Sequence, residues 1–217
     1  MKTTNAETRL IVFAKAPQPG AVKTRLMPLL GKAGAAALHA RLVEHTLATA
    51  CRADIGPVEL CCAPGDDPFF DYCRGQYGVS LAAQAEGDLG ARMQHAFARA
   101  LSAARHAVLV GTDCPALTVL HLRQAAHALA EGSNDAVLIP AEDGGYVMLG
   151  LNCCDAELFH DIEWGSANVM AATRDRLRRL RWRWKELETL WDIDRPEDYR
   201  RLLTSGLLDT GERASAD

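Results

Sequence analysis

Short apolar runs alternate with longer helical patterns along almost the whole of this 217-residue chain. The apolar runs have the length and β-branched content of strands, and they predict strands at 9–14, 57–63, 79–84, 107–111, 135–141, 146–151 and 181–185. The stretches between them carry apolar residues at helical spacing, and they predict helices at 31–53, 66–74, 88–104, 118–131, 167–180 and 195–203. Alternation at this pace predicts an α/β sandwich around a mostly parallel central sheet.

The length fits one large domain or two small ones. No internal repeat, linker or low-complexity segment divides the chain. We therefore expect a single domain over residues 1–208, followed by a flexible tail over 209–217.

Charge and composition exclude several function classes. Hydrophobic residues make up 48% of the chain and charged residues 24%, which is ordinary globular composition. The net charge of −4 argues against nucleic acid as a partner. The alternating Arg and Trp residues of 178–185 are better explained by a strand with Trp182 and Trp184 inward and arginines outward.

No targeting or membrane segment is predicted, because the apolar run at 10–14 is too short for a signal core or a bilayer span. The seven cysteines include two adjacent pairs, Cys61–Cys62 and Cys153–Cys154, and no C-x-x-C spacing. Adjacent residues of a strand point to opposite faces, so neither pair can chelate a metal in that setting. We interpret all seven as small buried thiols in a reducing cytoplasm.

In an open α/β sheet, ligands bind beyond the carboxyl ends of the strands, which directs attention to the loops there. The loop after the first predicted strand carries Lys15, Lys23 and Arg25, with Gly20 and two prolines between them. Fixed cations beside free backbone N–H groups suit a diphosphate, and we expect anion binding here. A solvated basic loop is the simpler alternative.

The run VLVGTDCPAL at 108–117 ends its predicted strand just before Asp113, and Pro115 blocks any continuation. A single carboxylate next to ligand phosphates is a usual way to hold Mg²⁺ or Mn²⁺. A helix cap or an Asx turn explains Asp113 equally well from the pattern alone.

Two further acidic stretches follow later strands. Glu142 and Asp143 precede a glycine pair, and either could bind sugar hydroxyls or act as a general base. Asp192 and Asp194 share one face of an extended stretch, with Pro196 opening a helix. Asp194 is explained as a cap for that helix, which leaves Asp192 as the candidate for a second metal ligand.

Five motifs in order resemble the nucleotide-diphospho-sugar transferase superfamily of GT-A type, a Rossmann-like fold. They are FAKAPQPGAVKTRL at 13–26, GDLGARM at 87–93, GTDCPAL at 111–117, PAEDGGYVMLG at 140–150 and DIDRPEDY at 192–199. The chain is most similar to a bacterial branch of small, single-domain, DUF2064-type glycosyltransferases linked by name to arsenosugar biosynthesis.

The resemblance implies that Lys15, Lys23 and Arg25 cradle the nucleotide phosphates and that Asp113 is the metal-binding acid. It also places Asp88 and Arg92 near the nucleotide. DIDRPEDY resembles the closing motif of small nucleotidyltransferases, including the phospholactate guanylyltransferase and molybdenum-cofactor types.

Three functions follow from these observations. The first is a glycosyltransferase that moves a sugar from a metal-held nucleotide-sugar to a small-molecule acceptor. The second is a nucleotidyltransferase that couples a nucleoside triphosphate to a phosphorylated small molecule. The third is a non-catalytic nucleotide-binding module that has kept the fold.

Overall fold

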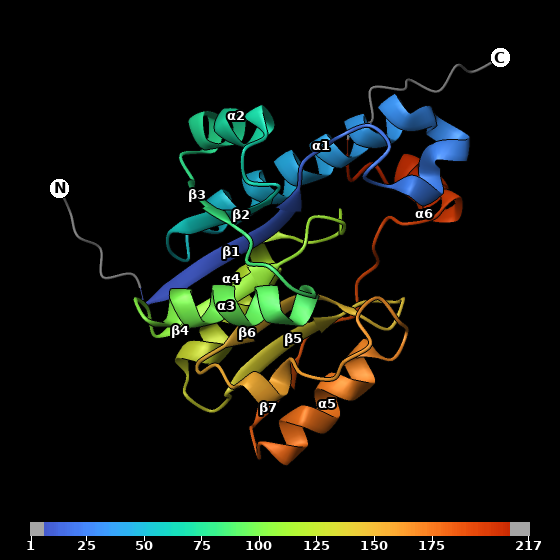
Figure 1. Cartoon of the computed structure of the whole chain (residues 1–217). Helices are drawn as coiled ribbons and strands as arrows, with labels where there is room; N and C mark the ends of the chain where they lie inside the picture. The colour runs from blue at the N-terminus through green and yellow to red at the C-terminus, as the bar shows by residue number, and fades with distance from the viewer. Residues whose placement is uncertain (1–6, 209–217) are drawn as a thin grey trace.

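Figure 1 shows the computed structural model, which describes residues 7–208. Its strands are β1 (Thr8–Lys15), β2 (Val58–Ala63), β3 (Ser80–Ala83), β4 (His106–Val110), β5 (Ala136–Pro140), β6 (Tyr146–Leu151) and β7 (Trp184–Glu186). Its α-helices are α1 (Met27–Ala53), α2 (Pro68–Tyr77), α3 (Leu89–Leu101), α4 (Val119–Ala130), α5 (Val169–Arg179) and α6 (Pro196–Ser205). Two short 3₁₀ helices that the sequence did not predict are η1 (Thr24–Leu26) and η2 (Ala156–Leu158). The predicted tail at 209–217 lies outside the described residues.

All seven predicted strands join one sheet, in the order β3-β2-β1-β4-β6-β5-β7. Every neighbouring pair is parallel except β4–β6 and β5–β6, so the sheet is mostly parallel, as predicted. The reversal at β6 follows from its connection to β5, because the residues at 141–145 are too few for a crossover helix.

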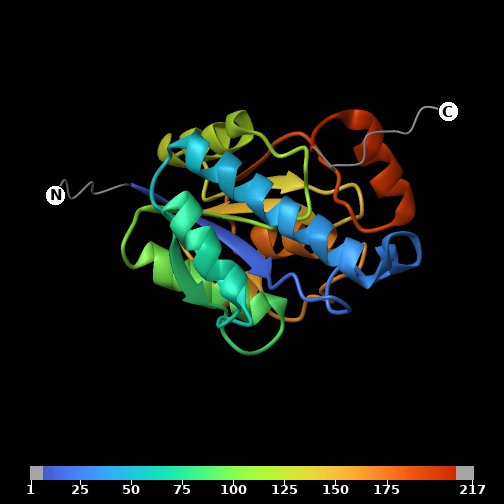
Figure 2. The same ribbon diagram turned by 90° about the horizontal axis from the view of Figure 1, so that it is seen from above.

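The sheet separates two apolar layers. One cluster joins α1, α2 and α4 to one face of the sheet, and a second joins α3 and α5 to the other face. Figure 2 shows α1 and α2 lying in front of the sheet on the side seen from above. Cys62 belongs to the first cluster and Cys61 to the second, as expected for adjacent residues of a strand covered on both sides.

A smaller apolar cluster anchors the C-terminal helix next to the start of α1. Leu26, Leu38 and Leu42 pack there against Trp191, Ile193, Tyr199 and Leu202. Figure 1 shows α6 beside the N-terminal turns of α1. This packing brings the residues just before α6 to the same edge of the sheet as the loop after β1.

Two local predictions need correction. The first helix begins at Met27 rather than at residue 31, and Gly31 interrupts it with φ 69° and ψ 170°. The strand predicted at 181–185 pairs only from Trp184, because Arg181 has a left-handed φ of 55° that a strand cannot contain. Trp182 and Trp184 nevertheless pack against the second apolar cluster, as predicted.

The cysteines are all free, but they are not uniformly buried. Cys153 is exposed, because it lies in the turn after β6 rather than within the strand. The prediction of seven buried thiols is therefore wrong at that position.

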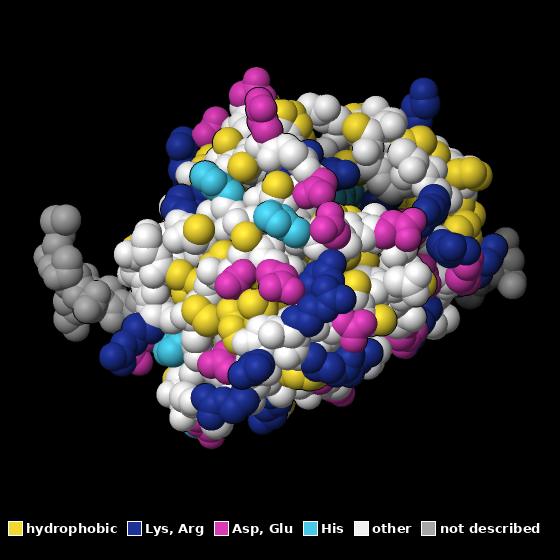
Figure 3. All heavy atoms as spheres, turned by 60° about the horizontal axis from the view of Figure 1, so that its bottom comes forward, with side chains coloured by type: hydrophobic (Ala, Val, Ile, Leu, Met, Phe, Trp, Pro, Cys, Tyr) yellow, Lys and Arg dark blue, Asp and Glu magenta, His cyan; other side chains and the backbone are white. Residues whose placement is uncertain are grey.

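Charges on the surface are mixed. Figure 3 shows Lys and Arg side chains interspersed with acids on the face turned forward from the bottom of Figure 1. On α5, Arg174 pairs with Glu186 at 2.7 Å and Arg178 pairs with Asp175, so part of the arginine-rich stretch is neutralised locally. Within residues 7–208, no helix combines the length and the apolar composition that crossing a bilayer requires.

Candidate active site at the carboxyl edge of the sheet

A cavity of about 510 Å³ opens where β1 and β4 end. Three stretches far apart in the sequence supply its polar lining: the loop after β1, the loop after β4 and the extended segment before α6. Its lining includes the Lys, Arg, His and Asp residues Lys15, Lys23, Arg25, His39, Asp113, Asp192 and Asp194. Six residues that the sequence analysis proposed from their positions after strands therefore line one cavity, as does His39.

Asp113 reaches this cavity because β4 stops at Val110 and the chain turns before the next helix. The cap of that helix is Thr118, whose hydroxyl accepts a hydrogen bond from His121 N–H. The helix-cap explanation for Asp113 is therefore wrong. Its side chain is 53% exposed and lines the cavity, while its backbone carbonyl accepts from Ile193 N–H at 2.8 Å.

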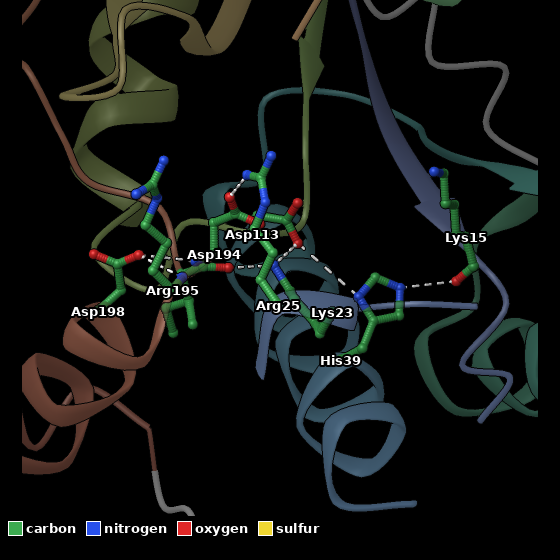
Figure 4. Close-up of polar contacts among 9 residues, drawn as sticks. Lys15, Lys23, Arg25, His39, Asp113, Asp194, Arg195 and Asp198 are labelled. Atoms are coloured by element: carbon green, nitrogen blue, oxygen red, sulfur yellow. Dashed lines mark hydrogen bonds and ion pairs between the residues drawn. The ribbon is translucent and has the colours of Figure 1, made fainter. Parts of the chain in front are cut away.

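Lys23 is the direct partner of that carboxylate. Its Nζ lies 2.5 Å from Asp113 Oδ1 and donates to the Ile193 carbonyl, also at 2.5 Å. The Lys23 side chain is only 5% exposed, and its backbone is left-handed at φ 49°. Figure 4 shows the Lys23 side chain between Asp113 and the segment that precedes Asp194. The three stretches of the site thus meet at one ammonium group.

Electrostatics keep Asp113 ionised. Desolvation by the surrounding protein would raise its pKa, but the Lys23 ammonium outweighs this effect and holds the pKa of Asp113 below its ordinary value. An ionised carboxylate with one oxygen bound to Lys23 retains lone pairs for a further ligand.

His39 belongs to the site, although the sequence patterns did not single it out. Its Nε2 lies 3.0 Å from the Lys15 carbonyl, and because a carbonyl only accepts, Nε2 carries the proton. Its Nδ1 lies 3.9 Å from Asp113 Oδ1, buried and without a hydrogen-bond partner among the described residues. Burial lowers the pKa of His39, despite the opposing effect of Asp113. The only sequence signal was a polar residue beside apolar Leu38 on the alanine-rich helix.

The extended segment after β7 positions the remaining acids. Leu190 N–H donates to Pro140 O, and Glu142 N–H donates to Leu190 O, so this segment runs alongside the end of β5. Burial, together with the charges of Asp113 and Asp143, raises the pKa of Asp192 to about 7. Burial is the larger of these causes, and it disfavours the charged form of the carboxyl group.

Asp194 does not cap α6. The first residue before that helix is Arg195, and the side chain of Asp198 accepts from both Asp194 N–H and Arg195 N–H. Asp194 instead forms an ion pair with Arg25 at the mouth of the cavity, as Figure 4 shows.

The two acids of the predicted turn separate in space. Glu142 forms a two-pronged ion pair with Arg201 of α6, which lowers the pKa of Glu142, and it does not line the cavity. Asp143 accepts from Gly145 N–H at 2.9 Å and lies close enough to Asp192 to raise the pKa of that group. Neither acid lines the cavity, and Asp143 is the one whose charge acts on Asp192.

Three predicted nucleotide contacts lie outside the lining of the cavity. Gly20 adopts φ 94° in the turn before Lys23. Asp88 caps α3 by accepting from Ala91 N–H at 2.8 Å, and Arg92 donates back to the Gly87 carbonyl at 2.9 Å. Leu89, the first residue of α3, is the part of this motif that reaches the cavity.

The order of strands, with one reversed strand and charged loops at the carboxyl edge, defines a Rossmann-like nucleotide-diphospho-sugar transferase fold of GT-A type. The chain belongs to the DUF2064 family, described as uncharacterized proteins conserved in bacteria, whose model matches residues 46–166.

Solved structures support this placement. A protein from Desulfovibrio desulfuricans G20, named provisionally as a nucleotide-diphospho-sugar transferase, is 31% identical, with a TM-score of 0.84 over 97% of this chain and 90% of its own. A nucleotidyl transferase from Methanothermobacter is 16% identical, with a TM-score of 0.61 over 90% and 95%. The manganese complex of Rv0371c from Mycobacterium tuberculosis is 19% identical, with a TM-score of 0.51 over 91% and 98%. A search of curated proteins finds no match.

Proposed function

We propose that this protein is a glycosyltransferase that uses a nucleotide-diphospho-sugar donor, a divalent metal and a small-molecule acceptor. The observation that carries the proposal is the meeting of Lys15 and Arg25 with Asp113 and Asp192 at one cavity of about 510 Å³. That volume suits a small-molecule ligand, and the charges suit a diphosphate held together with a cation. The provisional name of the Desulfovibrio relative agrees with this assignment.

A divalent ion would have two carboxylates to bind at this site. Burial, with the charges of Asp113 and Asp143, raises the pKa of Asp192, and a cation between Asp192 and Asp113 would favour the ionised form of Asp192. Within residues 7–208 no cluster of three or more His, Cys, Asp or Glu side chains is arranged to hold a metal. Asp113 and Asp192 would therefore hold Mg²⁺ or Mn²⁺ together with ligand phosphates and water, the usual arrangement for Mg²⁺.

The residues would have separate roles in the transfer. Lys15 and Arg25 would stabilise the charge that develops on the departing nucleoside diphosphate, and a bound metal would supply Lewis-acid stabilisation of the same charge. Asp143 would accept the proton of the acceptor hydroxyl in an inverting transfer. Glu142 is the weaker candidate for that role because Arg201 occupies both of its oxygens.

A nucleotidyltransferase is the second candidate. The nucleotidyl transferase from Methanothermobacter has the same fold, and the closing segment with Asp192 and Asp194 lines the same cavity. Such an enzyme would use the same cations and carboxylates on a nucleoside triphosphate and would release pyrophosphate.

One ligand panel separates these functions. Nucleotide-sugars and nucleoside triphosphates are tested by thermal shift with Mg²⁺, with Mn²⁺ and with chelator, because a ligand that binds the folded state raises the melting temperature. We expect a nucleotide-sugar to give the larger shift and to yield nucleoside diphosphate in the presence of an acceptor. Pyrophosphate release would favour the second candidate, and binding without turnover would favour a non-catalytic module. If no nucleotide stabilised the protein, the proposal would be wrong.

Asp113→Asn and Asp194→Asn form a matched pair for the metal assignment. We expect Asp113→Asn to abolish the metal-dependent part of the thermal shift, whereas Asp194→Asn retains it. We also propose a cytoplasmic location, since free thiols persist in a reducing compartment.

A further inference from the structure

Lys23 is a built-in cation in contact with one oxygen of the Asp113 carboxylate. Its ammonium contacts Asp113 Oδ1 and the Ile193 carbonyl at 2.5 Å each, and its side chain is 5% exposed. We propose that Lys23 is an internal counter-cation that competes with the divalent metal for Asp113 and exchanges that carboxylate for the donor diphosphate when metal and nucleotide bind together. This inference rests on the proposed function and assigns Lys23 a role other than a permanent phosphate ligand.

The first step concerns the cost of metal binding alone. A divalent ion at Asp113 would share one carboxylate with a lysine that is already in contact with it. Two positive groups on one carboxylate repel each other strongly at the effective dielectric constant of protein sites. Lys23 would then either share the carboxylate with the metal or leave it, and after leaving it would keep the Ile193 carbonyl as its hydrogen-bond acceptor. A buried ammonium that shares or loses its direct anionic contact is destabilised, so metal alone should bind weakly.

The second step concerns the surroundings of the pair. His39 Nδ1 lies 3.9 Å from Asp113 Oδ1, which is beyond hydrogen-bonding distance, while Nε2 is directed to the Lys15 carbonyl. His39 therefore makes no direct hydrogen bond that could replace the contact of Lys23 with Asp113. Lys23 is therefore the cation in contact with that carboxylate among the described residues.

The third step concerns the diphosphate. Lys23 lines the cavity together with Lys15 and Arg25, so a diphosphate placed among these cations would offer the released ammonium a new anionic partner. The diphosphate would then stabilise the ammonium that the metal displaces from Asp113, and the metal would free that ammonium to bind the diphosphate. The two ligands should bind with positive coupling that depends on Lys23.

The experiment measures Mn²⁺ binding to the nucleotide-free protein by electron paramagnetic resonance, with Lys23→Met, Lys15→Met and the unaltered chain compared. Both variants remove one lysine charge from the same loop, but only Lys23 contacts Asp113. We expect Lys23→Met to bind Mn²⁺ about tenfold more tightly or better, which corresponds to roughly 1.4 kcal/mol. Lys15→Met should change the affinity by less than about threefold.

Several results would overturn the inference: equal Mn²⁺ affinity of Lys23→Met and the unaltered chain, weaker binding by the variant, equal gains in both lysine variants, or no Mn²⁺ binding by any of them. Lys23→Gln provides a second neutral variant that can still donate to the Ile193 carbonyl, and it should show the same gain if Lys23→Met does not fold.

The coupling itself is measured by titrating UDP with and without Mn²⁺. Chelation of Mn²⁺ by UDP in solution is identical for all variants, so the difference between variants reports only on the protein. We expect the coupling factor to fall about tenfold in Lys23→Met, and an unchanged factor would contradict the exchange. If UDP and the other nucleotides do not bind at all, the proposed function fails, whereas the nucleotide-free Mn²⁺ comparison still decides the competition at Asp113.

Discussion

Arg201 holds Glu142 by two hydrogen bonds, at 2.7 and 3.2 Å, and places its guanidinium 4.3 Å from the centre of the Trp191 ring. This assembly joins α6 to the turn after β5 and to the residue just before Asp192. It explains why two neighbouring acids of one turn have different surroundings. Glu142 links the turn to α6 through Arg201, whereas the charge of Asp143 acts on Asp192.

Exchanging the two acids for their amides should separate these roles. We expect Asp143→Asn to lower kcat by about 10²-fold or more, the usual scale for loss of a positioned general base. Glu142→Gln should stay within about threefold of the unaltered chain, since its oxygens are occupied by Arg201. Steady-state kinetics on the best donor from the ligand panel gives the comparison, with melting temperature as the control for folding. A larger loss in Glu142→Gln than in Asp143→Asn would reverse the assignment.

Weakening the contacts of Arg201 with Glu142 and Trp191 should lower the free energy of unfolding slightly. Arg201→Lys keeps the charge but loses the two-pronged geometry and much of the stacking on Trp191. Because both partners of the ion pair are about half exposed, we expect the free energy of unfolding to fall by only about 1 kcal/mol. Urea denaturation measures this difference, and Arg200→Lys at the neighbouring position serves as the control. A loss as small as that of the control would show that the assembly contributes nothing to stability.

The raised pKa of Asp192 predicts how the stability of the folded protein depends on pH. Since the folded state raises that pKa to about 7, the folded protein binds a proton more tightly than the unfolded chain does. The stabilisation linked to this proton is complete below the ordinary pKa of an aspartic acid and disappears as pH rises through 7. Asp192→Asn should therefore become more stable than the unaltered chain as pH increases from 5 to 8, by a few kcal/mol at most. Denaturation in chelator at each pH tests this, and a difference that does not vary with pH would refute it.

Gly144 is required by the packing of the acidic turn. It adopts φ 92°, and a β-carbon there would lie 2.1 Å from the Ala167 carbonyl oxygen. Gly165 has a similar φ of 84°, but a β-carbon there would meet no atom within 4 Å. We expect Gly144→Ala to lower the free energy of unfolding by roughly 3 kcal/mol and Gly165→Ala by roughly 1 kcal/mol. Thermal denaturation of the pair separates the clash from the backbone strain that both share, and equal losses would argue against the clash.

Much of the fold could be predicted because apolar runs and helical spacing are local properties. The strands β1 to β6 and all six α-helices appear close to their predicted positions. The 3₁₀ turn at Thr24–Leu26 could not be predicted, since it depends on the left-handed backbone of Lys23. The strand predicted at 181–185 begins too early, because the alternation of its residues does not reveal the left-handed backbone of Arg181.

The site was predictable as a location but not as a set of contacts. Sheet-edge logic brought Lys15, Lys23 and Asp113 together, because the carboxyl ends of parallel strands share one edge. The ion pair of Glu142 with Arg201 joins residues about sixty positions apart in the chain, and sequence spacing does not encode that pairing. His39 was missed for a similar reason, since its role depends on the Lys15 carbonyl.

The reversed direction of β6 has a consequence for engineering this protein. Because β6 starts at the site and runs away from it, the turn at 141–145 is a hairpin between two neighbouring strands rather than the end of a long crossover. The loop with Lys15, Lys23 and Arg25 belongs to a different part of the chain and leads into α1. A substitution at Asp143 in the hairpin therefore leaves the loop proposed to hold the donor unchanged in sequence and connection.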